Sequence, residues 1–149
     1  MAAPYYLADE ALTHLVTEGL VQRPSDTGDL PTCYSNKRDS IPEPTAVNPV
    51  VCVLSEEGDI LQDSYLNGWR QKVLRVGVTA KVKNDASRLS EDIRLAWENL
   101  MMTVMGDLEV LWVRVYTATQ SIPVADRSFF YLQTDYQFML RTRALNEGT

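Results

Sequence analysis

The sequence contains little of what most catalytic or metal-binding sites need. It has two cysteines and one histidine in 149 residues, so neither a four-ligand Cys/His metal site nor a disulfide framework can be composed. We therefore expect Cys33 and Cys52 to be reduced thiols. No Gly-rich phosphate loop, GxSxG elbow, HExxH motif or EF-hand pattern occurs. These absences predict a protein that is not an enzyme and that holds no metal and no cofactor.

Basic clusters and long apolar runs are also scarce. The net charge is −6 and the sequence pI is near 4.7. Since nucleic-acid affinity comes from clustered lysine and arginine, we do not expect the chain to bind DNA specifically. No apolar run approaches the roughly 18 residues that span a bilayer, and residues 1–6 lack the basic and apolar regions of a signal peptide. We expect a soluble protein, made and used in a cytoplasm, with no membrane partner.

The clearest pattern is a strand followed by a helix within residues 71–105. Apolar residues alternate with polar ones in the first part, as in a half-buried strand, at Leu74, Val76, Val78, Ala80 and Val82. Residues 84–87 predict a helix cap. Apolar residues with helical spacing follow, at Leu89, Ile93, Ala96, Trp97, Leu100, Met101 and Val104. Gly106 and Asp107 are expected to end this helix, and the block carries no catalytic residue.

Further elements are predicted on both sides of this block. Residues 4–20 predict a helix that stops near Gly19. Residues 21–48 contain four prolines and are expected to form a long irregular loop, either an arm or a floppy connection. Strands are predicted at 49–55, 108–117 and 128–142, and a flexible tail at 143–149.

This order, α-β-β-α-β-β, predicts a single α+β domain spanning residues 1–149. Two hairpins, each preceded by a helix, favour a four-stranded, mostly antiparallel sheet with both helices packed on one face and a long proline-bearing loop beside it. Strand alternation then leaves apolar residues on the other face, at Val110, Trp112, Tyr116, Phe129, Tyr131 and Met139. Such a second apolar face indicates a surface for a partner. The alternative is that the long loop folds back over it.

In the order and spacing of its elements the chain resembles the tail-terminator proteins of long-tailed, siphophage-type phages. The resemblance comprises the helix ending in Leu-Val-Thr-Glu-Gly-Leu at 15–20, the proline-bearing stretch, the strand at 50–54 and the strand and helix at 73–105. It closes with the hairpin of 108–117 and 128–142, which contains Gln-Thr-Asp-Tyr-Gln-Phe at 133–138. Closely related neck and tail-completion proteins share this layout.

The resemblance implies a structural virion protein that forms a homohexameric ring. Such a ring binds the last ring of tail tube protein, ends tail polymerisation and presents a surface to the head–tail connector or neck protein. It lies at the head-proximal end of the tail and is assembled in the host cytoplasm. Genomic DNA passes through its lumen without specific binding, which agrees with an acidic chain.

Within this interpretation we expect contacts between subunits or with the tail tube at two sets of residues. The first set lies on the two longest loops, where a large aromatic and paired cations are not needed by the fold: Lys37, Arg38, Trp69 and Arg70. The second set is the aromatic part of the second sheet face: Trp112, Tyr116, Phe129 and Tyr131.

Three alternatives stay open. One is another neck, tail-completion or minor head protein of the same layout. A second is a regulatory α+β domain that binds a small molecule between subunits. The third is a hydrolase-like enzyme, which a single histidine, His14, placed off the apolar stripe of its helix, does not favour.

Overall fold

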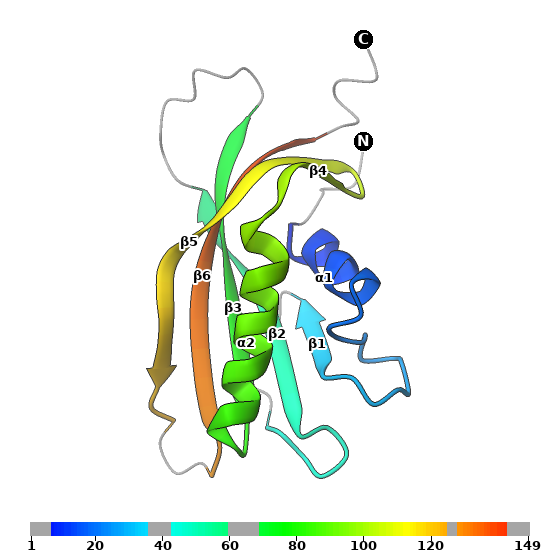
Figure 1. Ribbon diagram of the computed structural model, residues 1–149, viewed down its shortest axis with the longest axis vertical. Coiled ribbons are helices and arrows are strands. Elements are labelled where there is room, and N and C mark those ends of the chain that lie inside the picture. Colours follow the sequence, from blue (N-terminus) through cyan, green and yellow to red (C-terminus); the bar gives the residue numbers. More distant parts are fainter. Residues whose placement is uncertain (1–6, 36–42, 60–68, 125–127, 143–149) are drawn as a thin grey trace.

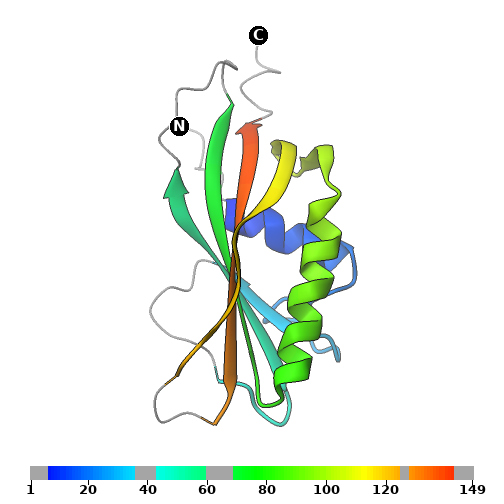
Figure 2. The same ribbon diagram turned by 60° about the vertical axis from the view of Figure 1, so that its left-hand side comes forward.

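The structure is a computed structural model that describes residues 7–35, 43–59, 69–124 and 128–142. These residues form α1 (Leu7–Thr17), β1 (Thr32–Ser35), β2 (Val50–Asp59), β3 (Arg70–Ala80), α2 (Lys83–Glu98), β4 (Met101–Met105), β5 (Leu108–Ile122) and β6 (Phe130–Thr142). The six strands make one mixed sheet in the order β1-β2-β3-β6-β5-β4. Both helices lie on the same face of this sheet, which curls into half a barrel (Figures 1 and 2).

The expected four-stranded sheet is wrong, because a further strand occupies each edge. β1 lies within the stretch expected to be irregular and pairs parallel with β2, from Thr32↔Val51 to Ser35↔Leu54. On its other side, Gln22 donates its N–H to the Pro31 carbonyl and accepts from the Cys33 N–H, both at 2.9 Å. Proline does not prevent this strand, because Pro31 lies just before its first residue. At that position the N–H that proline lacks is not needed for a hydrogen bond of the sheet.

The second extra strand, β4, arises where the periodicity predicts more helix. α2 ends at Glu98, with Asn99 as its C-cap, and residues 101–105 then pair antiparallel with β5. Met101, Thr103 and Met105 fit the alternation of a strand as well as Met101 and Val104 fit helical spacing, so the apolar pattern permitted both structures. Gly106, at φ +58°, turns the β4–β5 hairpin and does not end a helix.

The predicted helix ends are correct in one helix and displaced in the other. Gly19, at φ +76°, closes α1 as expected, because glycine adopts this left-handed conformation without steric cost. α2 begins earlier than its predicted cap: its N-cap is Val82, which has extended backbone and no side-chain capping bond. Residues 84–87 therefore lie inside the helix.

β5 carries the irregularities that bend the sheet. It is 15 residues long, and its register with β6 shifts between Val110 and Trp112, between Val115 and Thr117, and between Thr117 and Gln120. Such bulges add residues to one strand and increase its bend and twist. They also break the alternation used above: Val110 is fully buried in the core and does not share a face with Trp112.

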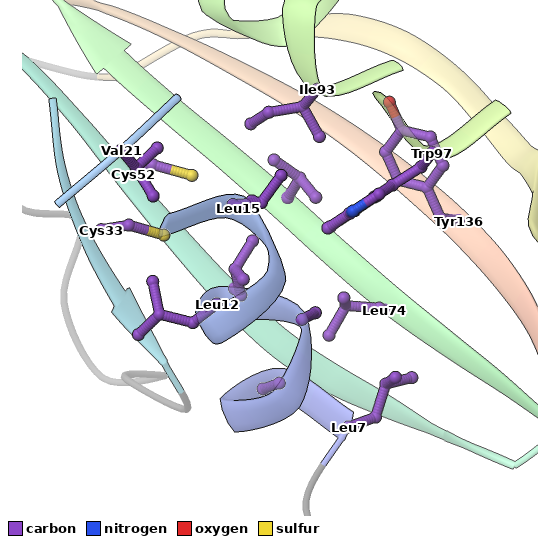
Figure 3. Close-up of a cluster of buried hydrophobic side chains, with 14 of the residues drawn as sticks. Leu7, Leu12, Leu15, Val21, Cys33, Cys52, Leu74, Ile93, Trp97 and Tyr136 are labelled. Atoms are coloured by element: carbon purple, nitrogen blue, oxygen red, sulfur yellow. The ribbon is translucent and has the colours of Figure 1, made fainter. Parts of the chain in front are cut away.

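The core fills the space between the sheet and the two helices (Figure 3). Trp97 of α2 lies at its centre, fully buried. Its ring centroid is 5.0 Å from that of Tyr136 and 5.4 Å from that of Phe138, both in edge-to-face geometry. The apolar face of α1 packs beside it with Leu7, Leu12 and Leu15. The central strands and both helices thus share one continuous core.

The two cysteines are neighbours in this core. Cys33 of β1 and Cys52 of β2 are direct register partners, and both are buried and free. Burial, followed by a hydrogen bond with Cys52, raises the pKa of the Cys33 thiol well above its usual range. Because the thiolate is the reactive form, the buried Cys33 thiol is protected from chemistry in the folded protein.

Candidate interaction surface

The face of the sheet opposite the helices, called the helix-free face below, is built from three central strands. Since Tyr136 and Phe138 contact Trp97, the odd-numbered residues of β6 point to the opposite face. The register of β5, β6 and β3 then places side chains in rows: Trp112–Met139–Gln71, Arg114–Gln137–Val73 and Thr117–Asp135–Arg75. The face therefore mixes aromatic, cationic and amide groups and is not simply apolar.

Two arginines of this face lie over tryptophan rings. The Arg114 guanidinium carbon is 4.7 Å from the Trp112 ring centroid, and the Arg141 carbon is 4.5 Å from that of Trp69. Each contact is worth roughly 0.5–1 kcal/mol at an exposed site. Because tryptophan and arginine are enriched at the energetic centres of protein interfaces, these pairs mark a surface suited to a protein partner.

The arginines are also held by polar neighbours. Arg114 Nε donates to Gln137 Oε1 at 2.7 Å, and the Gln137 amide donates in turn to Gln71. Arg141 Nε donates to Glu109 Oε2 at 2.6 Å. Gln137 is almost fully buried although it points away from both helices. These contacts fix the orientation of the long side chains before any partner binds, which lowers the entropic cost of binding.

Arg75 joins three strands in the middle of the face. Its Nε lies 3.0 Å from Asp135 Oδ1 on β6, and its Nη1 lies 2.5 Å from Glu57 Oε1 on β2. The hydrogen bond to Asp135 is the main cause of the raised pKa of Arg75, which stays positively charged. Asp135 is buried, and its carboxylate is paired with this guanidinium group.

Tyr131 lies over Gly77 next to this ion-pair network. A Cβ atom at Gly77 would come within 2.7 Å of Tyr131 Cε1 and 2.8 Å of its hydroxyl oxygen. The hydroxyl group donates to Gln133 Oε1 at 3.3 Å, and burial raises the pKa of the phenol. Only glycine leaves room for the ring to lie flat on the sheet here.

We predict that Gly77→Ala lowers the free energy of unfolding by about 1–3 kcal/mol, the usual cost of overpacking. The measurement is urea denaturation followed by circular dichroism. In a Tyr131→Ala background, the added methyl group should cost less than half as much. Equal costs in both backgrounds would show that the ring is not what requires glycine.

The structure places three of the eight predicted contact residues on one side of the sheet, the two tryptophans near one end of β6 and Tyr131 near the other. Trp69, Trp112 and Tyr131 lie on the helix-free face or at its margin. Arg70 is exposed at the start of β3, in register with Leu140. The other predicted residues are dispersed: Tyr116 is exposed beside a β5 bulge and Phe129 is half-buried just before β6. Lys37 and Arg38 lie outside the described residues.

The arginines and the buried amide were missed by the sequence reasoning. Arg114 follows Trp112 by two positions and Arg141 follows Met139 by two, so strand alternation alone places each pair on one face. The sequence prediction considered only apolar residues on that face, so it did not include the arginines. Arg75 and Asp135 could not be paired from sequence, because their contact depends on β3 and β6 being neighbours.

The remaining titratable groups do not form a second site. In the described ranges, no cluster of three or more His, Cys, Asp or Glu side chains is arranged to hold a metal ion. His14 Nε2 lies 3.7 Å from Glu18 Oε1; burial lowers its pKa, and Glu18 partly opposes that shift. Neither described helix combines the length and apolar character needed to cross a membrane.

Comparison with known proteins adds a similarity of fold. No protein-family model matches the sequence, and no curated protein sequence matches it. Among solved structures, a chain from the virion of a native gene transfer agent particle matches with a TM-score of 0.55 at 10% sequence identity. The match covers 91% of this chain and 94% of that chain. At this identity the match establishes a shared fold across nearly the whole length of both chains.

Proposed function

We propose that this chain is a structural virion protein of a phage-like particle, and specifically a tail-terminator or closely related tail-completion protein. The observation that carries the proposal is the shared fold with a chain of a gene transfer agent virion over 91% of this chain. The order of elements that resembles tail terminators gives the finer assignment. The proposal includes no enzymatic activity, metal or cofactor.

In this role the chain forms a ring, expected to be hexameric, at the head-proximal end of a tail. The ring contacts the last ring of tail tube protein on one side and the head–tail connector or neck protein on the other. DNA passes through its lumen without specific binding, since an acidic surface repels phosphates. Assembly takes place in the host cytoplasm.

The helix-free face is the surface that we assign to the tail tube. It presents Trp69, Trp112 and Tyr131 together with Arg114 and Arg141, and their polar contacts preset its geometry. A rigid surface of this composition suits repeated protein contacts around a ring.

The test of this function is a deletion of the gene for this chain in the producing cells. If the chain terminates tails, particles made without it will carry tails of abnormal length that lack heads, as seen by negative-stain electron microscopy. The wild-type chain supplied in trans will restore normal tails, and mass spectrometry will detect it in purified particles. Tails of normal length joined to heads would contradict the terminator assignment, and absence of the chain from particles would contradict a virion role.

A double variant tests the assigned surface. Trp112→Ala with Arg114→Ala should weaken binding to purified tail tubes by about thirtyfold or more, since a central tryptophan–arginine pair contributes about 2 kcal/mol or more. Co-sedimentation with tail tubes measures the affinity. Arg94→Ala is the matched control, because Arg94 is a cation on the helix-covered side. Equal binding by both variants would place the tail contact elsewhere.

A further inference from the structure

Two groups of exposed apolar residues lie on segments near opposite ends of α2; Figure 1 shows β4 at one end of this helix and the start of the helix at the other. The first, the β4 pole, consists of Met101, Met102 and Val104, which are 76%, 69% and 50% exposed. The second, the α2 pole, consists of Val82, Phe130 and Val47, which are 54%, 43% and 87% exposed. α2 has 16 residues and so separates the poles by about 24 Å. Most other large apolar side chains of the described residues are buried or half-buried, so this distribution is not random.

Carboxylates lie at the turn of the β4 pole, while the cation beside the pole, Arg141, is paired with Glu109. Asp107 lies in the β4–β5 turn, and the Glu10 carboxylate lies against Gly106, where an added Cβ atom would clash with Glu10 Oε2. Burial raises the pKa of Glu10, and the nearby charges of Asp107 and Asp9 raise it further. The C-terminus of α2, with its negative dipole end, lies at the same end of the molecule, and Glu98 there is paired with Arg94. Arg70 also lies at this end, but three strands away from β4.

The α2 pole carries the opposite charge. Val82 lies between Lys81 and Lys83, and all three are exposed. The positive dipole end of α2 begins here without a side-chain cap. Asp85 is the acidic residue in the first turn of α2. Ala80 pairs with both Phe130 and Val50, which places Phe130 and the 45–48 turn beside this basic segment.

The β4 pole also has an unusual backbone. β4 is an edge strand with apolar side chains, whereas natural edge strands usually carry lysine or proline to prevent pairing. Met102 holds φ +49°, a conformation that costs a non-glycine residue about 1 kcal/mol or more and that often marks a functional position. Val82 is extended, at φ −110° and ψ 124°, but its carbonyl accepts from the Asp85 and Ala86 N–H groups, so the α2 pole offers its side chains for contact and no free strand.

We propose that copies of this chain associate head to tail, with the α2 pole of one copy seated on the β4 pole of the next. A contact between identical poles would bring lysine against lysine or carboxylate against carboxylate, which is unfavourable. A contact between unlike poles joins opposite charges and covers both apolar patches at once. Contacts of this heterologous kind repeat, and they close into a ring when the rotation permits. The inference deepens the proposed function, because it assigns the contact between ring subunits.

Two variants remove one pole each while preserving the fold. Met101→Ser with Met102→Asn alters the β4 pole, and asparagine tolerates positive φ better than most residues. Val82→Ser with Lys83→Glu alters the α2 pole; serine is a favourable N-cap and glutamate suits the first helical turn. Both sets of changes are therefore compatible with folding, which thermal unfolding will verify. Leu95→Ser is the matched control, since Leu95 is an exposed apolar residue on α2 that belongs to neither pole.

The measurement is solution mass by light scattering on a size-exclusion column. The wild-type chain and Leu95→Ser should form oligomers, whereas each pole variant alone should self-associate at least a hundredfold more weakly. An equimolar mixture of the two pole variants should form a dimer of 16.8 kDa chains and nothing larger. In that dimer the intact α2 pole of one variant meets the intact β4 pole of the other.

Two outcomes would overturn the inference. Pole variants that keep the wild-type mass would show that copies join elsewhere, and a mixture that stays monomeric would exclude pairing of unlike poles. The inference and the proposed function can fail separately. If both pole variants still form rings and restore normal tails, the proposed function stands and the inference is wrong. If the chain assembles head to tail but is absent from purified particles, the inference stands and the proposed function is wrong.

Discussion

Trp97→Ala will lower the free energy of unfolding by about 3–5 kcal/mol, the range measured for deletion of large buried aromatic side chains. Trp97 is fully buried where α2 meets β6, and both its aromatic neighbours lose their edge-to-face partner in the variant. The cavity lies at the centre of the shared core, so neighbouring side chains cannot easily fill it. Urea denaturation followed by far-UV circular dichroism measures the change.

Trp97→Phe separates packing from hydrogen bonding at the same position. The Trp97 indole N–H is buried without a hydrogen-bond partner, a state that costs about 1–3 kcal/mol. Phenylalanine removes this donor while keeping most of the aromatic contacts, so it should cost less than half as much as alanine. If both variants were equally unstable, ring packing against Tyr136 and Phe138 would not explain the effect. Trp112→Ala, at the sheet surface, should change stability by about 1 kcal/mol or less.

The parts of the fold that were predicted correctly are those whose pattern has one interpretation. The alternation from Leu74 to Ala80 fits a strand alone, and β3 has that register. The helical spacing through Trp97 likewise fits a helix alone, and it points into the core. Gly19 predicted the end of α1 because positive φ strongly favours glycine.

The errors arose where local pattern does not determine structure. Residues 101–105 satisfy both periodicities, and their pairing with β5 decides in favour of a strand. β1 has only four residues and is stabilised by β2 and the backbone of Gln22, which no local window contains. The bulges of β5 have no sequence signature, so Val110 was assigned to the wrong face.

The candidate surface was predictable only in part, for the same reason. Its aromatic residues follow from alternation, and Trp112 and Tyr131 do lie on the helix-free face. Its polar contacts need the strand order β3-β6-β5, which brings Arg75 to Asp135 and Arg114 to Gln137 from positions 60 and 23 residues apart. For a surface built across several strands, alternation in the sequence therefore predicts which side chains it contains. The contacts between those side chains can be known only from the strand order of the fold.

Arg75→Met will lower the free energy of unfolding by about 2–3 kcal/mol at neutral pH. Methionine keeps the length of the side chain but leaves the buried Asp135 carboxylate without its cation, and an unpaired buried charge is costly. Arg75 itself is about one-third exposed, so we expect less than the full cost of a completely buried pair.

Two companion variants test whether the cost of Arg75→Met comes from leaving Asp135 unpaired or simply from removing an arginine. Arg75→Met with Asp135→Asn should recover at least half of the stability, since the amide carries no charge to compensate. Arg94→Met is the matched control: Arg94 also pairs with two carboxylates, Glu91 and Glu98, but all three lie on the exposed side of α2. Exposed pairs contribute little because water and salt screen them, so Arg94→Met should be nearly neutral. If Arg75→Met were equally mild, Asp135 would be stabilised by its strand neighbours and not by the cation, and the centre of the helix-free face would tolerate substitution.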